Sequence, residues 1–157
     1  LAELYPEKNL CGLDFVPSSR DLMDEIAKAR NIKLTGRIFD MRKPDLSFKL
    51  APGSAVLHIV AVEQLASDIE PLLGYLLENK PGICVGVEPT VEFYDETKLF
   101  DYLAAKFHRK RGYTVGYLPR LKELEKEGKV KVLGAKRTYF GSLFMEGYSY
   151  IVWKPAG

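Results

Sequence analysis

The stretch "NLCGLDFVPSSRDLMDEIAKARN", residues 9–31, combines a short apolar run, an aspartate and an amphipathic segment. The apolar run has the length and the Gly and Pro neighbours of a strand. Apolar residues then recur at helical spacing over 22–29, and either Ser18 or Ser19 is a suitable helix cap. Asp14 therefore stands where a buried strand ends and a helix is about to begin. Its role decides between an enzyme domain and a plain α/β scaffold.

Strand and helix patterns alternate along the rest of the chain. Strands are expected at 32–39, at the start of 54–65 and at 82–89, and helices at 68–79, 96–111 and 116–129.

Two β-rich runs at 130–141 and 148–155 close the sequence. The gap of about six residues between them is too short for a helical crossover, so the two runs must be antiparallel. The sequence thus predicts a single α/β domain over residues 1–157. We expect a doubly wound, mostly parallel sheet with helices on both faces and a C-terminal antiparallel β-hairpin.

Composition limits the classes of function. The net charge of +2 is too small to argue for nucleic acid, and the basic run at 106–111 is explained by the C-terminus of a helix. Apolar stretches are too short to span a bilayer and no signal peptide is recognisable, so we expect a cytoplasmic protein without a membrane partner. Cys11 and Cys84 lie in apolar runs and are expected to be buried reduced thiols. No Cys/His cluster indicates a metal site.

Polar residues follow successive predicted strands. Asp14, Asp40, the segment 58–64 and Glu88 all lie at strand ends, and ligands of open parallel α/β sheets bind outside the carboxyl ends of the strands. A carboxylate there can accept hydrogen bonds from ribose hydroxyls, and one on the next strand can accept from an adenine amino group. Either aspartate alone is better explained as a loop cap. Two of them across one β–α–β unit favour a nucleotide site.

The order of these segments resembles the class I S-adenosylmethionine-dependent methyltransferases. "NLCGLDFVPSSRDLMDEIAKARN", "GRIFDMRKPD" and "AVLHIVAVEQLASDIEPLLGYLLENKPGICVGVEP" are similar to the second to fifth strands of that family with their acidic ends. The closing antiparallel pair is similar to the family's most distinctive topological feature. The resemblance covers essentially the whole chain and implies the Rossmann-like methyltransferase fold. A narrower similarity is to enzymes described as sugar or small-molecule O-methyltransferases.

The resemblance also implies a cofactor, S-adenosylmethionine, and residues that hold it. Asp14, with Phe15 beside it, would hold the ribose hydroxyls. Asp40, with Met41 beside it, would contact the adenine. The segment 58–60, which contains His58, would run past the methionine part.

The chain departs from the family in one respect. The family's first strand and its glycine-rich loop should precede residue 1, and no GxGxG motif occurs in this sequence. That strand is central in the family's sheet, and leaving its neighbours unpaired is costly. We therefore expect about 50–100 further residues upstream, by the usual size of such domains. Residues 1–157 would then be the C-terminal portion of a longer domain.

Several residues are candidates for the methyl-transfer site. His58 can serve as the base that takes the acceptor's proton, or it can be a hydrogen-bonded histidine inside a buried strand. Glu63 can act on or position the acceptor, or it can stabilise the first turn of a helix. Glu88, Tyr94 and Tyr139 are candidates for binding the acceptor, while ordinary loop and hairpin packing explain them equally well.

Three functions are compatible with these patterns. The first is a methyltransferase that acts on a hydroxyl of a small molecule, such as a sugar or a natural-product precursor. The second is a methyltransferase-like scaffold without catalysis, with a binding or assembly role. The third, a nicotinamide-dependent oxidoreductase, is disfavoured because dinucleotide-binding folds usually continue with parallel strands.

Overall fold

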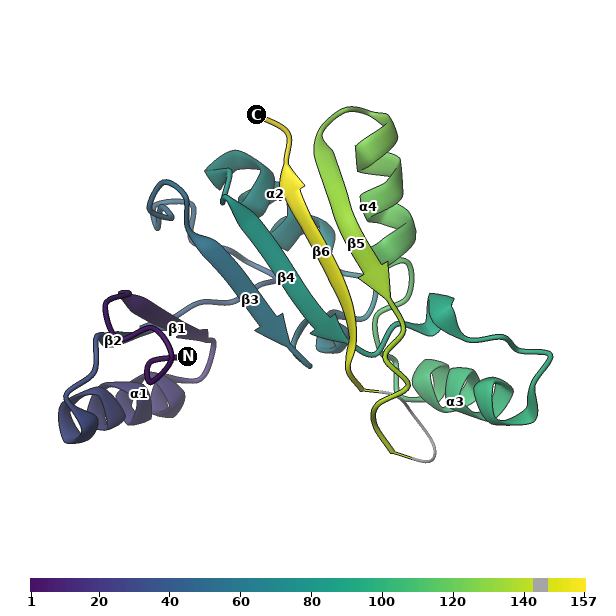
Figure 1. Cartoon of the computed structure of the whole chain (residues 1–157), viewed down its shortest axis with the longest axis horizontal. Coiled ribbons are helices and arrows are strands. Elements are labelled where there is room, and N and C mark those ends of the chain that lie inside the picture. The colour runs from purple at the N-terminus through teal and green to yellow at the C-terminus, as the bar shows by residue number, and fades with distance from the viewer. Residues whose placement is uncertain (143–146) are drawn as a thin grey trace. The chain divides into compact units, whose positions relative to one another are not determined.

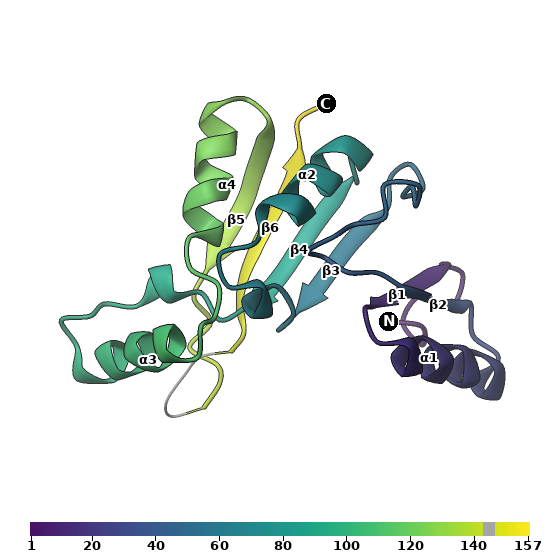
Figure 2. The same ribbon diagram turned by 180° about the vertical axis from the view of Figure 1, so that it is seen from behind.

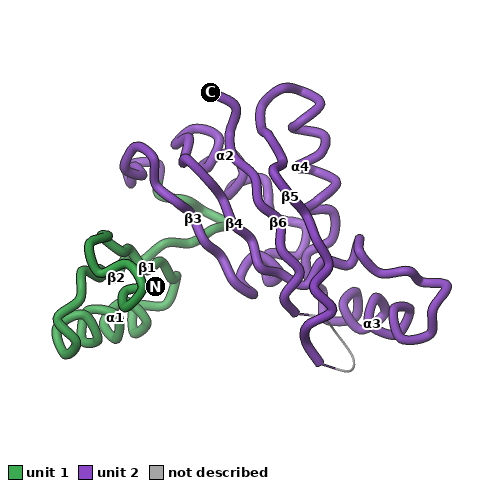
Figure 3. The backbone as a smooth tube through the Cα atoms, viewed as in Figure 1, with its two compact units in different colours: residues 1–45 green, residues 46–157 purple. Residues whose placement is uncertain are grey.

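The computed structural model describes residues 1–142 and 147–157, and the chain divides into two compact units. Unit 1 comprises residues 1–45 and unit 2 comprises residues 46–157 (Figure 3). Together the two units contain α-helices and both parallel and antiparallel strands, so the expected α/β class is confirmed. Each unit is described below by itself.

Unit 1 is one β–α–β element. It consists of β1 (Leu10–Asp14), α1 (Pro17–Arg30) and β2 (Leu34–Ile38), and the two strands are parallel. Helix α1 begins directly at Pro17, whose fixed φ suits the first helical position. Val16 stands at the cap position and no side chain caps the helix, so the expected cap by Ser18 or Ser19 is wrong.

Two glycines let α1 lie close to its strands. A Cβ at Gly36 would lie 2.5 Å from the carbonyl oxygen of Arg20, and one at Gly12 would collide with the Met23 side chain. The Asp24 carboxylate adds a link, since it accepts the Gly36 N–H at 2.8 Å. Cys11, expected to be buried, is exposed. Its run alternates between partly covered and exposed positions because only one face of this short sheet carries α1.

Unit 2 is built on a four-stranded sheet. Its strands are β3 (Ala55–Ile59), β4 (Ile83–Glu88), β5 (Val130–Lys136) and β6 (Ser149–Pro155), in the order β3-β4-β6-β5. β3 and β4 are parallel, while β6 is antiparallel to both β4 and β5. The segment between β5 and β6 includes residues 143–146, which lie outside the described residues. A complete hairpin therefore stays a prediction, as does the doubly wound arrangement.

Four helices and two short 3₁₀ turns complete the described part of the chain. Besides α1 they are α2 (Glu70–Asn79), α3 (Leu99–Lys110), α4 (Tyr117–Lys126), η1 (Val62–Leu65) and η2 (Val91–Phe93). Helices α2 and α4 lie on the same face of the sheet, as Figures 1 and 2 show from opposite sides.

The core of unit 2 lies between this sheet face and the two helices. Large, fully buried side chains come from all three parts: Leu73 and Leu76 of α2, Leu121 of α4, and Ile151 and Trp153 of β6. Each such side chain contributes about 1.5–3 kcal/mol relative to an exposed position. The packed face fixes the direction of β3 and β4, and with it the place where their carboxyl ends meet. Within the described residues, no helix is long and apolar enough to cross a membrane.

Candidate functional site

The two aspartates of unit 1 lie at the same edge of its sheet. Asp14 stands opposite Ile38 in the parallel pairing, and the Phe39 N–H donates to the Asp14 carbonyl oxygen at 2.8 Å, so the chain reaches Asp40 beside the end of β1. Asp14 Oδ1 accepts the Val16 N–H at 2.9 Å. Asp40 Oδ1 accepts the Arg42 N–H at 2.8 Å.

Both aspartates therefore accept a backbone N–H in a local turn, as expected for residues that cap loops. Each turn uses one carboxylate oxygen, so capping leaves the second oxygen for another donor. Phe15 beside Asp14 is 67% exposed, and Met41 beside Asp40 is half-buried. The edge therefore presents two carboxylates with an apolar residue next to each, a set that suits a nucleoside.

His58 lies in unit 2 and is bonded at both ring nitrogens. Its Nδ1 lies 2.8 Å from Glu88 Oε1, and its Nε2 lies 3.3 Å from the Tyr117 hydroxyl. Since a carboxylate only accepts, Nδ1 carries the proton, and neutral Nε2 accepts from Tyr117. The Tyr117 oxygen in turn accepts the Trp153 indole N–H at 3.1 Å. This buried chain of bonds matches the alternative of a satisfied histidine within a strand.

Glu88 is the centre of this arrangement and is only 3% exposed. Besides His58, its carboxylate accepts three backbone N–H groups, from Ala61 and Val62 at 3.1 Å and from Glu63 at 3.2 Å. Ala61 directly precedes η1, and Val62 and Glu63 are its first two residues. Glu88 Oε1 thus faces His58 and two backbone N–H groups, while Oε2 accepts the Glu63 N–H.

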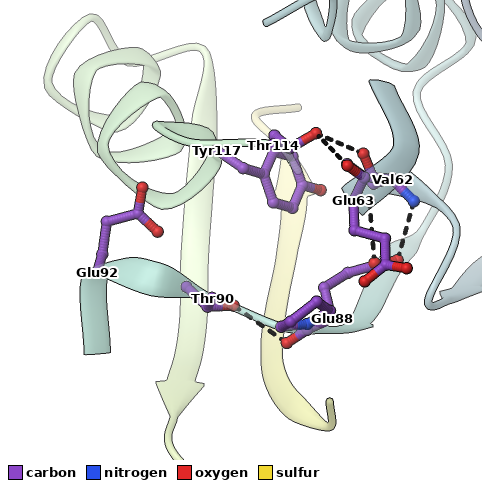
Figure 4. Close-up of a pocket in the computed structure, with 8 residues that line it drawn as sticks. Val62, Glu63, Glu88, Thr90, Glu92, Thr114 and Tyr117 are labelled. Atoms are coloured by element: carbon purple, nitrogen blue, oxygen red, sulfur yellow. Dashed lines mark hydrogen bonds between the residues drawn. The ribbon is translucent and has the colours of Figure 1, made fainter. Parts of the chain in front are cut away.

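A small pocket opens beside Glu88 (Figure 4). Its volume of about 10 Å³ is room for about one water molecule. Its lining combines carboxylates, hydroxyls and apolar groups, from Val62, Glu63, Glu88, Pro89, Thr90, Glu92, Thr114 and Tyr117.

Glu63 is the unusual member of this lining. Its side chain is 5% exposed, and its Oε2 has no hydrogen-bond partner among the described residues. Burial raises the pKa of Glu63, and the nearby Glu88 carboxylate raises it further, although Arg111 opposes both effects. A carboxyl group of this kind can hold a proton or receive a donor from a ligand.

Thr114 fixes the same turn from the opposite side. Its hydroxyl donates to the Val62 carbonyl oxygen at 2.6 Å (Figure 4). Its backbone N–H donates to the Glu63 carbonyl oxygen at 2.8 Å. Thr114 and Tyr117 were not among the residues predicted from the sequence for this site. No local pattern identifies them, because Thr114 lies in the connection between α3 and α4 and Tyr117 is the first residue of α4, both more than fifty residues further along the chain.

Tyr94 and Tyr139 are brought together elsewhere in unit 2. The Arg137 guanidinium lies over both rings, 5.3 Å from the Tyr94 centroid and 4.6 Å from the Tyr139 centroid. Arg137 also donates two hydrogen bonds to Asp101, at 2.6 and 2.7 Å. Neither tyrosine lines the pocket beside Glu88. In the described part of the chain, no group of three or more His, Cys, Asp or Glu side chains could hold a metal ion.

Comparison with known proteins gives matches in structure and none in sequence. No protein family and no curated protein sequence matches this chain. An O-methyltransferase family 2 protein from Planctomyces limnophilus, solved with apigenin, matches with a TM-score of 0.64 at 10% identity. The N,N-8-amino-8-demethyl-D-riboflavin dimethyltransferase RosA from Streptomyces davawensis matches with 0.60 at 13% identity. The methyltransferase domain of bacterial CtHen1-C matches with 0.53 at 14% identity.

These matches cover nearly all of this chain, 99% for the first two and 98% for the third. The chain spans 46% and 44% of the first two proteins and 83% of the third. This protein therefore has the class I methyltransferase fold that its sequence resembles.

Proposed function

We propose that this chain is part of an S-adenosylmethionine-dependent methyltransferase that transfers a methyl group to a hydroxyl of a small molecule, such as a sugar or a natural-product precursor. The observation that carries the proposal is the likeness of almost the entire chain to several methyltransferases. Two carboxylates at the carboxyl edge of β1 and β2 support it, because ligands of open parallel α/β sheets bind outside the carboxyl ends of the strands.

The cofactor would supply an electrophilic methyl group on sulfur, and the chain's own residues would bind and orient it. Asp14, with one carboxylate oxygen closing its turn, would accept ribose hydroxyls with the other. Asp40 would accept the adenine amino group, and the exposed Phe15 ring and Met41 would contact apolar parts of the nucleoside.

On the acceptor side, His58 and Glu63 are the candidates for taking the hydroxyl proton. His58 Nε2 already accepts from Tyr117, so it would have to release that bond first. Glu63 Oε2 has no partner to release among the described residues. We therefore favour Glu63 as the proton-accepting or acceptor-orienting group.

The first experiment is calorimetric titration of the protein with S-adenosylhomocysteine. Asp14→Asn keeps an oxygen for the Val16 N–H but loses the charge, so it should weaken binding by about 1 kcal/mol or more. Asp21→Asn removes a carboxylate on the exposed surface, at a salt bridge to Arg20, and should leave affinity unchanged. Equal affinities for wild type and Asp14→Asn would remove Asp14 from the site.

The second experiment separates an enzyme from an inactive scaffold. The protein is incubated with methyl-labelled donor and a panel of hydroxylated small molecules, including sugars and phenols, and label transfer is measured. Transfer to a hydroxyl supports the proposal. Absence of any binding heat at millimolar S-adenosylhomocysteine would favour the scaffold with a binding or assembly role.

A further inference from the structure

The segment from Val60 to Ala66, here called the β3–η1 turn, contains two residues in a backbone conformation that L-residues rarely adopt. Val60 has a φ of 51°, although it is β-branched. Ala66 has φ 55° and ψ −117°, a combination normally taken by glycine at the second position of a type II′ turn. Such residues persist only where the surrounding structure holds them, and they gather at functional sites.

Glu88 is the group best placed to hold this turn. Its carboxylate accepts the N–H groups of Ala61, Val62 and Glu63, the three consecutive residues that follow Val60. The carboxylate is itself fixed by His58, which Tyr117 and Trp153 fix in turn. Because one carboxylate accepts three backbone N–H groups, its loss would leave three donors of the turn without a partner at once.

The conformation held in this way has one chemical consequence. The Glu63 backbone N–H donates to the Glu88 carboxylate, and the Glu63 carbonyl oxygen accepts the Thr114 N–H. The backbone of Glu63 is therefore fixed on both sides. Its side chain then lines the pocket with Oε2 unpartnered among the described residues. Leaving a buried carboxyl oxygen without a donor is unfavourable, and a ligand that brings a donor would relieve it.

We propose that Glu88 is a positioning residue, which holds the β3–η1 turn in its strained conformation and thereby keeps Glu63 Oε2 available to a hydrogen-bond donor of the methyl acceptor. Glu88 itself does not touch the acceptor. This replaces the expectation that Glu88 binds the acceptor directly. The proposal rests on the proposed function only in naming the donor as part of a methyl acceptor.

The first test measures native-state hydrogen exchange in the full chain, which needs neither cofactor nor acceptor. Glu88→Gln puts an amide N–H₂ where backbone donors converge, and Glu88→Asp keeps the charge but withdraws the carboxylate. Each variant should speed exchange at the amides of Ala61, Val62 and Glu63 by at least about 10-fold. Leu124→Ala is the matched control, since it destabilises the core while leaving the hydrogen bonds of Glu88 to the turn in place. Wild-type exchange at these three amides in both Glu88 variants would overturn the proposal.

The second test asks whether Glu88 maintains the strain. Ala66→Gly relieves a positive φ, so it should raise the folding equilibrium constant about 2- to 5-fold. Ala61→Gly makes the same chemical change in the same turn at φ −121°, and should lower that constant. In the Glu88→Asp background the gain from Ala66→Gly should disappear, because the released turn relaxes. An equal gain in both backgrounds would show that Glu88 does not hold the strain.

The third test follows the Glu63 carboxyl carbon by NMR during a pH titration. Glu88→Asp keeps the neighbouring negative charge and only withdraws it by one methylene, so a purely electrostatic role shifts the Glu63 titration less in this variant than in Glu88→Gln, which removes the charge. A positioning role moves it toward that of an ordinary glutamate, because the released turn lets water reach Glu63. Leu124→Ala should leave it unchanged. If S-adenosylhomocysteine does not bind while these three tests succeed, the proposed function fails and the role of Glu88 stands.

Discussion

At the scale of single residues, Gly86 shows how the backbone makes room for a buried side chain, that of His58. Gly86 stands opposite His58 in the pairing of β3 with β4, and a Cβ there would collide with the imidazole ring. The ring can reach Glu88 and Tyr117 only because that space is open. The glycine in the stretch "VGVEP" is thus a steric requirement of the histidine.

Gly86→Ala should therefore displace His58 and weaken its bond to Glu88. We expect a loss of about 1–3 kcal/mol in the free energy of unfolding, measured by urea denaturation. Gly74→Ala is the matched control, because a Cβ at Gly74 in helix α2 meets nothing within 4 Å. It should stabilise the protein by about 0.5–1 kcal/mol. A neutral Gly86→Ala would mean that the ring does not need this space.

The positions of the candidate residues were predictable only where they depend on local order. Asp14 and Asp40 were identifiable because each follows an apolar run that ends in a turn. The partners of His58 were not, since Glu88 and Tyr117 lie 30 and 59 positions away and are brought in by the sheet and by α4. Glu88 was expected to face an acceptor, and nothing in its neighbours reveals that three backbone N–H groups surround it.

At the scale of elements, apolar periodicity predicted the order of strands and helices, and the ends were less predictable. The third helix was expected from residue 96, but α3 begins at Leu99. Asp95 accounts for the difference, because its side chain accepts the Thr97 N–H and its carbonyl oxygen accepts the Lys98 N–H. These bonds form a turn that delays the helix. Such competition between side chain and backbone is invisible to periodicity.

One ion pair ties α3 to the chain that follows β5. Asp101 on α3 accepts two bonds from Arg137, which hold the pKa of Asp101 at about 2. Since a lowered carboxyl pKa stabilises the folded state, this stability is complete above the ordinary pKa of 3.8 and is lost as the pH falls through about 2. Asp101→Asn should cost about 3 kcal/mol at neutral pH, by urea denaturation.

The comparison with Glu96→Gln makes this prediction specific. Glu96, just before α3, forms an exposed ion pair with Arg109 of that helix. Loss of this pair should change the free energy of unfolding little. The difference between wild type and Asp101→Asn should shrink as the pH falls from 3.8 toward 2. A difference that stays constant over this range would show that ionised Asp101 does not stabilise the fold.

Folding stability depends on pH at a second place, the end of α3 and its connection to α4. Here the titrating group is a histidine, whose protonated form is charged, instead of a carboxyl group. His108 is fully buried and its Nε2–H donates to the Thr114 carbonyl oxygen at 2.8 Å. Burial lowers the pKa of His108 below its ordinary 6.5. The unfolded chain therefore binds this proton more readily. The contribution of neutral His108 is complete above pH 6.5 and is lost as the pH falls through the lower folded-state pKa.

Urea denaturation between pH 5 and pH 8 measures this effect. Wild type should lose stability on the acid side of pH 6.5, and His108→Gln should show a smaller slope over the same range. The turn held by Thr114 should loosen in parallel, with faster exchange of the Thr114 amide, which donates to Glu63. Identical slopes for the two proteins would remove His108 as the source.

At the scale of the whole molecule, burial is distributed unequally between the two units. In unit 1 only Gly36 and Phe39 are buried, and helix α1 contributes no buried residue. Every other buried apolar side chain belongs to unit 2. β1 and β3 each pair on one side only within the described residues. Parallel sheets usually have both faces covered. The further strand that the sequence analysis expects upstream stays a prediction.

This distribution predicts how the chain behaves when it is divided at the boundary between the units. Residues 46–157 should fold alone and unfold cooperatively, because they keep the sheet, α2, α4 and the core around Trp153. Residues 1–45 should not, because two strands and one helix with two buried residues cannot offset the loss of chain entropy. Circular dichroism during thermal unfolding of each segment is the measurement. A cooperative transition in residues 1–45 would show that α1 packing on Gly12 and Gly36 suffices for folding. A non-cooperative melt of residues 46–157 would show instead that the core of unit 2 depends on the preceding segment.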